Sequence, residues 1–202
     1  MNDPSEYLRN LPHIQPETGI FSITFRLHGS LPKESVLRLS EEYHAQQKQI
    51  NPVNDKLKTH LQNDYFITFD ESLNDKLGPM FLKEPEIGNL VSQAIHFRDN
   101  KEYNLICFCI MPNHVHLIIY KIQKPLFRIL QSLKRFTAFE ANKILRKQGS
   151  FWQKESYDHL IKSRKELADT ISYILNNPVK AGLVSDWNEW GYTYCKPLFL
   201  DR

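Results

Sequence analysis

The chain has 202 residues, 41% of them hydrophobic and 24% charged, a composition that fits one globular domain and excludes a low-complexity or fibrous protein. No apolar run approaches the roughly 20 residues of a membrane span, residues 1–11 lack a signal-peptide layout, and the three cysteines suit a reducing compartment, so we expect a cytoplasmic protein with no membrane contact. The formal charge of +3 is too small to indicate nucleic-acid binding by itself, so the distribution of charge matters more than the total.

The N-terminal half predicts one strand followed by helices. Apolar and polar side chains alternate over residues 19–27, which is typical of a half-buried strand. A polar helix is expected over 32–49, and turn-forming residues over 51–55 end it. Apolar residues recur at helical spacing over 85–99. We therefore predict a helical insertion at approximately 50–100, after the first strand.

Two short apolar runs, 103–111 and 114–120, are separated by a Pro-Asn turn and predict an antiparallel hairpin. Within the second run, His114 and His116 are separated by one apolar residue, so both imidazoles project from one face of the strand. Such a pair is half of a metal site. A four-residue turn would place Cys109 opposite His116 and allow a zinc site. We favour a three-residue turn, which directs the cysteine thiols to the other face.

Positive charge is concentrated in one predicted helix, residues 125–148. Its apolar residues, among them Phe136 and Ile144, recur near the helical period, which predicts a buried stripe with the basic residues outside. Eight basic side chains and one acid lie in 121–147. This surface is either simply solvated or binds DNA phosphates, and the candidate DNA contacts are Arg128, Lys134 and Arg135.

A further strand is expected over residues 151–161, and a helix after it. Ser163 and Glu166 form a capping-box pattern that begins this helix, which should end near Pro178. Tyr173 and Asn177 are one helical turn apart, on a flank away from the apolar stripe, where they offer a hydroxyl and an amide. Taken alone, a tyrosine such as Tyr173 is more often a packed aromatic residue, and an asparagine such as Asn177 is more often a helix-end residue than a metal ligand.

One more histidine precedes this helix. His159 is either an accessory residue for proton transfer or part of a hydrogen-bonded structural pair. The order of elements predicts an α+β fold over residues 1–202 as a single domain, with a ferredoxin-like antiparallel sheet and helices packed on one face.

At this point the sequence resembles a known family, the single-tyrosine HUH transposases, and within it the REP-associated tyrosine transposases. Residues 111–117 (MPNHVHL) are similar to the family's histidine motif, and residues 172–184 (SYILNNPVKAGLV) to its tyrosine helix and the exit from it. Shorter similar segments are ITFRL at 23–27, GP at 78–79 with LKEPE at 82–86, and FWQ at 151–153.

The resemblance implies an HUH endonuclease fold and a function. His114, His116 and Asn177 would bind a divalent metal, Mg²⁺ or Mn²⁺, and Tyr173 would be the nucleophile. The reaction implied is cleavage and transfer of single-stranded DNA through a 5′-phosphotyrosine intermediate, as in transposition. The implied partner is single-stranded or hairpin DNA of the REP type, bound by a nucleoid-associated protein that acts as a monomer or a homodimer.

Two rival functions use the same residues. The first is a metallo-phosphodiesterase, which has the same ligands but uses water as the nucleophile. The second is a catalytically inactive, zinc-stabilised DNA-binding protein, in which Cys109 completes the metal site.

Overall fold

The computed structural model describes residues 19–50, 55–74 and 78–200. Two segments with sequence predictions fall wholly or mostly outside these ranges, namely the N-terminal stretch 1–11 and the turn-forming segment 51–55. Among the described residues, no helix is both long and apolar enough to cross a membrane.

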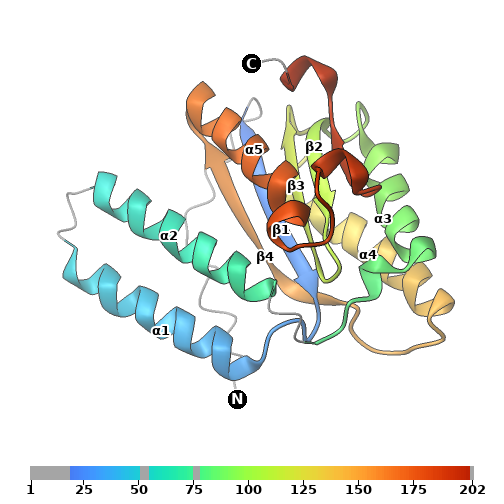
Figure 1. Ribbon diagram of the computed structural model, residues 1–202, viewed down its shortest axis with the longest axis horizontal. Coiled ribbons are helices and arrows are strands. Elements are labelled where there is room, and N and C mark those ends of the chain that lie inside the picture. The colour runs from blue at the N-terminus through green and yellow to red at the C-terminus, as the bar shows by residue number, and fades with distance from the viewer. Residues whose placement is uncertain (1–18, 51–54, 75–77, 201–202) are drawn as a thin grey trace.

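An antiparallel sheet of five strands forms the centre of the molecule (Figure 1). The strands lie in the order β4-β1-β3-β2-β5, so the first strand is flanked on both sides by strands from later in the chain. This order confirms the ferredoxin-like sheet that the sequence predicted. The strands are β1 (Ile20–Leu27), β2 (Asn104–Ile110), β3 (His114–Tyr120), β4 (Trp152–Ile161) and β5 (Thr193–Cys195).

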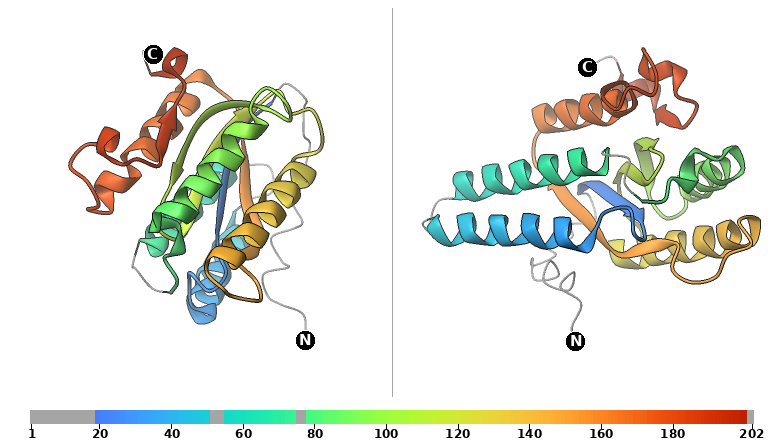
Figure 2. Two further views of the ribbon diagram at one scale, coloured as in Figure 1. Left: turned by 90° about the vertical axis from the view of Figure 1, so that its right-hand side faces the viewer. Right: turned by 60° about the horizontal axis from the view of Figure 1, so that its bottom comes forward.

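Helices cover both faces of this sheet. Helices α3 (Pro85–Arg98) and α4 (Leu126–Ile144) pack on one face, as predicted, and α5 (Arg164–Lys180) packs on the other (Figures 1 and 2). Helices α1 (Lys33–Gln49) and α2 (Asp55–Leu73) form a helical pair that extends away from the sheet. The insertion expected at approximately 50–100 overlaps α2 and α3, and it does not include α1. Short 3-10 helices span Phe81–Lys83, Trp187–Glu189 and Pro197–Phe199.

The alternation in the first strand decides what each face of the sheet contains. Phe21, Ile23 and Phe25 are buried in the core beneath α3 and α4. Thr24 and Arg26 are also buried, but they point to the opposite face, where α2 and α5 lie. The sheet therefore has one mainly apolar face and one face that carries buried polar side chains.

The register of the β2–β3 hairpin differs from the one we favoured. Cys109 pairs with His116, and Met111 donates a backbone hydrogen bond to the carbonyl of His114, so the register is that of the four-residue turn, the alternative that we did not favour. Because paired residues point to the same side, Cys109 shares the face of His116. The prediction that its thiol lies on the other face is wrong, since one residue of register reverses every side chain.

The buried stripe of α4 was only partly predicted. Phe136 and Ile144 are 46% and 42% exposed, so their assignment to the core is wrong. Thr137 takes the buried position instead, and its hydroxyl accepts a hydrogen bond of 2.8 Å from the indole of Trp152. A buried threonine is stable here because the indole and the preceding helical turn satisfy its hydroxyl.

Helix α5 begins where it was predicted and ends slightly later. The Ser163 hydroxyl accepts a hydrogen bond from the Glu166 backbone amide, whereas the Glu166 carboxylate bonds to the Lys162 amide, so only half of the capping box forms. Pro178 lies inside the last turn, and the helix continues to Lys180. A proline this close to the end disrupts few helical hydrogen bonds, which explains the short extension.

Candidate active site

Strand β3 places both histidines of the motif on the α5 face of the sheet. His114 and His116 are 0% and 1% exposed, while Val115 between them points into the opposite core. The Nε2 atoms of the two imidazoles lie 3.0 Å apart. The strand geometry therefore aims two nitrogen donors at one small volume.

Each imidazole is held by a second contact. Nδ1 of His114 lies 2.7 Å from Oδ1 of Asn113, whose amide nitrogen in turn donates to the carbonyl of Leu73 at the end of α2. Nδ1 of His116 lies 3.0 Å from the hydroxyl of Thr24 on β1. Contacts of this kind fix the tautomer and the ring orientation of metal-binding histidines.

The protonation state of His114 follows from its surroundings. Asn113 Oδ1 can only accept a hydrogen bond, so Nδ1 of His114 carries the proton and Nε2 keeps its lone pair. Burial lowers the pKa of His114 to about 3, and repulsion from His116 acts in the same direction. The imidazole is therefore neutral at physiological pH, as a metal ligand must be.

Helix α5 brings its two predicted residues to the same place. The amide nitrogen of Asn177, a residue that is 1% exposed, lies 3.0 Å from Nε2 of His116. The ring of Tyr173 lies 6.3 Å from the ring of His116, centroid to centroid. Spacing along the helix sets this arrangement, because residues four apart share one face.

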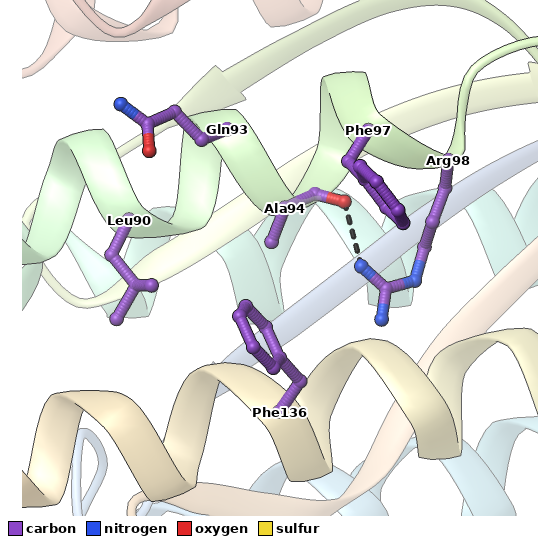
Figure 3. Close-up of a pocket in the computed structure, with 6 residues that line it drawn as sticks. All are labelled: Leu90, Gln93, Ala94, Phe97, Arg98 and Phe136. Atoms are coloured by element: carbon purple, nitrogen blue, oxygen red, sulfur yellow. Dashed lines mark hydrogen bonds between the residues drawn. The ribbon is translucent and has the colours of Figure 1, made fainter.

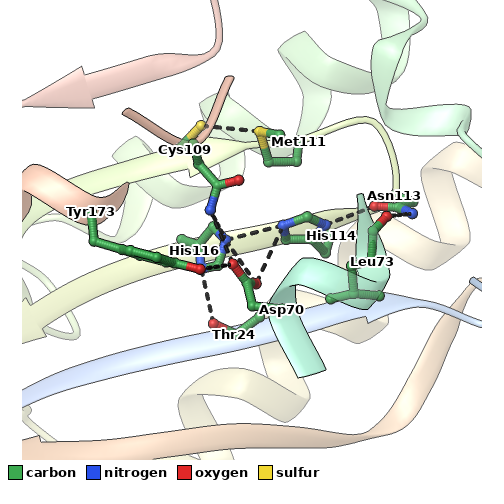
Figure 4. A network of polar contacts seen from close by, with 10 residues as sticks. Thr24, Asp70, Leu73, Cys109, Met111, Asn113, His114, His116 and Tyr173 are labelled. Carbon is green, nitrogen blue, oxygen red and sulfur yellow. Dashed lines mark hydrogen bonds and ion pairs between the residues drawn. The ribbon is translucent and has the colours of Figure 1, made fainter. Parts of the chain in front are cut away.

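A fifth side chain, Asp70 of α2, lies at the centre of this group and was not anticipated from the sequence (Figure 4). Its Oδ2 accepts hydrogen bonds of 2.5 Å from the Tyr173 hydroxyl and 3.1 Å from the Asn177 amide. Its Oδ1 lies 3.2 Å from Nε2 of His116 and 3.6 Å from Nε2 of His114. Asp70 thus contacts all four of the predicted metal and catalytic residues.

Aromatic contacts hold the end of α2 over the sheet. Phe66 stacks on Tyr157 of β4 with ring centroids 4.6 Å apart, and the guanidinium of Arg26 lies 5.7 Å from the centre of the Phe69 ring. Asp70 follows Phe66 by one helical turn, so an acid occupies the apolar side of this helix. In the sequence, an acidic residue on the apolar side of a helix is the signal that could have identified Asp70. The apolar residues of this stretch show little helical periodicity, so the apolar side of the helix could not be recognised.

The electrostatics of the cluster keep the phenol protonated. Burial raises the pKa of Tyr173 well above its ordinary value, and the negative charge of Asp70 raises it further. Burial alone would also raise the pKa of Asp70, but attraction to His116 and His114 and the hydrogen bonds that it accepts hold that pKa below its usual range. A cation near Tyr173 is therefore needed to make it a nucleophile.

The same atoms can hold a metal ion. Among the described residues, one group of three histidine, cysteine or acidic side chains has ligand atoms within 4.8 Å of one another, and it consists of Asp70, His114 and His116. Imidazole nitrogens with a carboxylate are a common donor set for divalent metals.

Cys109 takes no part in that group, although it shares the face of His116. Its sulfur lies 3.7 Å from the sulfur of Met111 and accepts a hydrogen bond from the Thr193 hydroxyl. Burial raises the pKa of this thiol to about 12, so it remains protonated. Among the described residues, the group of side chains whose ligand atoms could share a metal does not include this thiol, so the geometry does not favour the zinc-stabilised alternative.

The three predicted DNA contacts have different surroundings on α4. Arg128 and Arg135 are exposed. Lys134 instead donates hydrogen bonds of 2.9, 3.5 and 3.0 Å to oxygens of residues 154–156 on β4. Its ammonium is therefore engaged with the edge strand of the sheet.

His159, the predicted accessory residue, is paired with an acid. Its Nε2 lies 2.6 Å from a carboxylate oxygen of Glu166 in the first turn of α5. This contact matches the structural alternative for His159, because it ties β4 to the start of the helix.

A second concave region lies on the other side of the sheet. An open pocket of about 350 Å³ separates α3 from α4 (Figure 3). Its cation is already engaged, because Arg98 donates hydrogen bonds to the Ala94 carbonyl and to the Ser132 hydroxyl. The pocket offers no constellation of catalytic side chains. It is lined by Leu90, Gln93, Ala94, Phe97, Arg98 and Phe136.

Comparisons with known proteins agree with this geometry. Residues 83–177 match the family model described as IS200-like transposase, which includes both histidines and ends at Asn177. A Haemophilus influenzae protein that carries the name REP-associated tyrosine transposase is 29% identical over 102 residues. That match covers 45% of this chain and 58% of the relative, so the chain spans little more than half of the relative's length.

A solved structure of a REP-associated tyrosine transposase bound to a REP hairpin has the same fold. It matches with a TM-score of 0.55 and 14% identity, covering 91% of this chain and 81% of that chain. These findings confirm the resemblance indicated by the two sequence motifs, and they confirm the HUH fold.

Proposed function

We propose that this chain, which matches the IS200-like transposases over residues 83–177, cleaves and rejoins single-stranded DNA with Tyr173 as the nucleophile. One observation carries the proposal. The Tyr173 hydroxyl and the Asn177 amide from α5 and the imidazoles of His114 and His116 from β3 converge around one buried carboxylate from α2. Such a constellation of phenol, amide and paired imidazoles is suited to a metal-dependent transfer of a phosphoryl group.

The imidazoles of His114 and His116, with the amide oxygen of Asn177, are the proposed ligands of a divalent metal. When bound, the metal polarises the scissile phosphate and neutralises charge on the leaving oxygen. Two nitrogen ligands suit Mn²⁺, whereas Mg²⁺ prefers oxygen, and we expect either ion to support the reaction.

Tyr173 performs the covalent step. Its phenol oxygen forms a bond to the phosphorus, and the bond from the phosphorus to the 3′ oxygen breaks. The phenol proton leaves along the existing hydrogen bond to Asp70, and the 3′ oxygen takes a proton from water. The products are a 5′-phosphotyrosine and a free 3′-OH, so one phosphodiester is conserved and the reverse reaction rejoins a strand without ATP.

The proposed substrate is a DNA hairpin with a single-stranded flank, since the matched solved structure holds a REP hairpin. Arg128 and Arg135 would contact phosphates from α4. Helix α4 and the histidines lie on opposite faces of the sheet, so a DNA molecule that contacts both passes round a sheet edge. A protein acting on such DNA is expected to work on the nucleoid in the cytoplasm, as a monomer or a homodimer.

The site is covered, and this affects how DNA enters. His114, His116 and Asp70 are at most 1% exposed, and α2 lies over them. A phosphate therefore reaches the imidazoles only after side chains that cover the site move.

A covalent adduct tests the proposed function. The full chain is incubated with labelled single-stranded hairpin DNA and Mn²⁺, and a denaturing gel reports labelled protein. We expect an adduct with the wild type and with Tyr120→Phe, a control at the far end of β3. Tyr173→Phe and His114→Ala should give none.

The same gel distinguishes the water-dependent phosphodiesterase. An adduct in Tyr173→Phe would overturn the assignment of the nucleophile. Cleavage by Tyr173→Phe at the wild-type rate, without any adduct, would establish water as the nucleophile.

A further inference from the structure

The two oxygens of the Asp70 carboxylate have different surroundings. Oδ2 accepts hydrogen bonds from Tyr173 and Asn177. Oδ1 is fully buried, and within the described part of the chain it accepts no hydrogen bond. A buried carboxylate oxygen without a donor is costly, because it has lost its hydration without replacement. Its neighbours in the site are the Nε2 atoms of His116 and His114, 3.2 and 3.6 Å away, so a cation shared with these two nitrogens would satisfy Oδ1.

The amide of Asn177 shows a similar asymmetry. Its nitrogen has two neighbours, Nε2 of His116 at 3.0 Å and Oδ2 of Asp70 at 3.1 Å. Its oxygen is buried and, among the described residues, has no hydrogen-bond donor. Rotation of the amide by a half-turn exchanges these two atoms and directs the oxygen at the cluster.

The spacing of the donor atoms fits a shared ion. Atoms bound at about 2.1 Å from one octahedral or tetrahedral metal lie about 2.9–3.5 Å apart. The two imidazole Nε2 atoms are separated by 3.0 Å, and Oδ1 of Asp70 lies 3.2 and 3.6 Å from the nitrogens of His116 and His114. Two of these separations lie within the range for neighbouring ligands, and the third, 3.6 Å, lies just beyond it.

Charge gives a further reason. The three ligands of the proposed function, His114, His116 and Asn177, are neutral when they bind a metal. A buried divalent cation held by neutral groups alone would carry uncompensated charge in a medium of low dielectric constant. Asp70 is the one acidic member of the group that the described residues form around this point.

We propose that Asp70 is the anionic ligand of the metal, binding through Oδ1 while Oδ2 holds the Tyr173 hydroxyl beside the ion. The inference rests on the proposed function for the metal and the nucleophile, and it adds a ligand from outside the two sequence motifs. The helical insertion then has a defined role, because α2 completes the metal site when it packs on the sheet.

Metal affinity tests the inference directly. The full chain is freed of metal with EDTA and titrated with Mn²⁺, and electron paramagnetic resonance measures the unbound ion. Asp70→Asn keeps the shape of the side chain and removes its charge. We expect at least about tenfold weaker Mn²⁺ binding, the scale seen when support for a metal site is lost. The matched control Asp64→Asn, an exposed residue of the same helix, should bind like the wild type.

A second measurement addresses the ligand itself and keeps the inference testable if Asp70→Asn folds poorly. The visible spectrum of Co²⁺ depends on ligand type and geometry, so it should differ between wild type and Asp70→Asn at saturating Co²⁺. Asp70→Glu keeps a carboxylate and should bind Mn²⁺ more tightly than Asp70→Asn. Wild-type Mn²⁺ affinity, or a wild-type Co²⁺ spectrum, in folded Asp70→Asn would overturn the inference, as would Asp70→Glu binding no better than Asp70→Asn.

These outcomes are separate from the test of the proposed function. An adduct that depends on Tyr173, together with metal affinity that is independent of Asp70, would leave the function intact and refute the ligand. Metal affinity that depends on Asp70, without any covalent adduct, would support Asp70 as a ligand and refute the proposed function.

Discussion

Thr24 and His116 face each other across the β1–β3 ladder, with the threonine hydroxyl 3.0 Å from Nδ1 of the imidazole. The hydroxyl is a second support for a proposed metal ligand, and it comes from a strand about 90 residues away in sequence. The ladder fixes the distance between the two backbones, so the contact depends on the sheet and not on a flexible loop.

Replacement of this hydroxyl should weaken the metal site without removing a ligand. Thr24→Val keeps the shape and the β-branched backbone preference, but the His116 ring loses a partner that fixes its orientation. We expect Mn²⁺ affinity to fall by about tenfold, and Thr24→Ser, which keeps the hydroxyl, to restore most of it. Titration with Mn²⁺ measures both. Equal affinity in the valine variant would show that the contact does not support the ligand.

The burial of His114 predicts how stability depends on pH in the metal-free protein. The unfolded chain takes up a proton at this residue near pH 6.5, whereas burial holds the folded-state pKa at about 3. Between these values the unfolded state binds more protons than the folded state. The contribution of His114 to the free energy of unfolding is therefore fully present above pH 6.5 and is lost as the pH falls toward 3.

His114→Asn removes this titration. Urea unfolding in EDTA, measured from about pH 7 down to about pH 4.5, should give a flatter pH dependence for the variant than for the wild type. Asp70 acts in the same direction, but chiefly near and below the ordinary carboxyl pKa of 3.8, which lies below this range. Parallel curves for the two proteins would contradict the neutral, buried state of His114.

Lys134 should stabilise the fold, although the sequence analysis proposed it as a DNA contact. Its ammonium donates to two carbonyls and a hydroxyl of β4, so Lys134→Met removes a charged donor from three acceptors that are exposed or partly buried. We expect a loss of about 1–3 kcal/mol in the free energy of unfolding, measured with urea. A change below about 0.5 kcal/mol would show that these hydrogen bonds contribute little.

Arg135, the next residue, should show the opposite behaviour. It is exposed on α4, so Arg135→Ala is expected to change stability by less than about 0.5 kcal/mol. If it contacts a phosphate, affinity for hairpin DNA falls and the slope of log K against log salt decreases by about one. Titrations at several salt concentrations measure the slope, and an unchanged slope would exclude this contact.

Local pattern was sufficient for much of the fold. Alternation identified β1, the Pro-Asn turn identified the β2–β3 hairpin, and the capping residue Ser163 placed the start of α5. These features depend on residues close in sequence. Local pattern could not give the register of Cys109, because one residue more or less in the turn reverses the face of every side chain. It could not give the exposure of Phe136 either, because that depends on what packs against α4.

By itself, the sequence determined the candidate chemistry: paired histidines on a strand, a tyrosine and an asparagine one helical turn apart, and their similarity to one family. Only the tertiary structure brought Asp70 to them, from a helix 103 residues before Tyr173. The physical reason is that periodicity describes which way a side chain points within its own element. Which element it meets is decided by packing, here the aromatic contacts that hold α2 on the sheet.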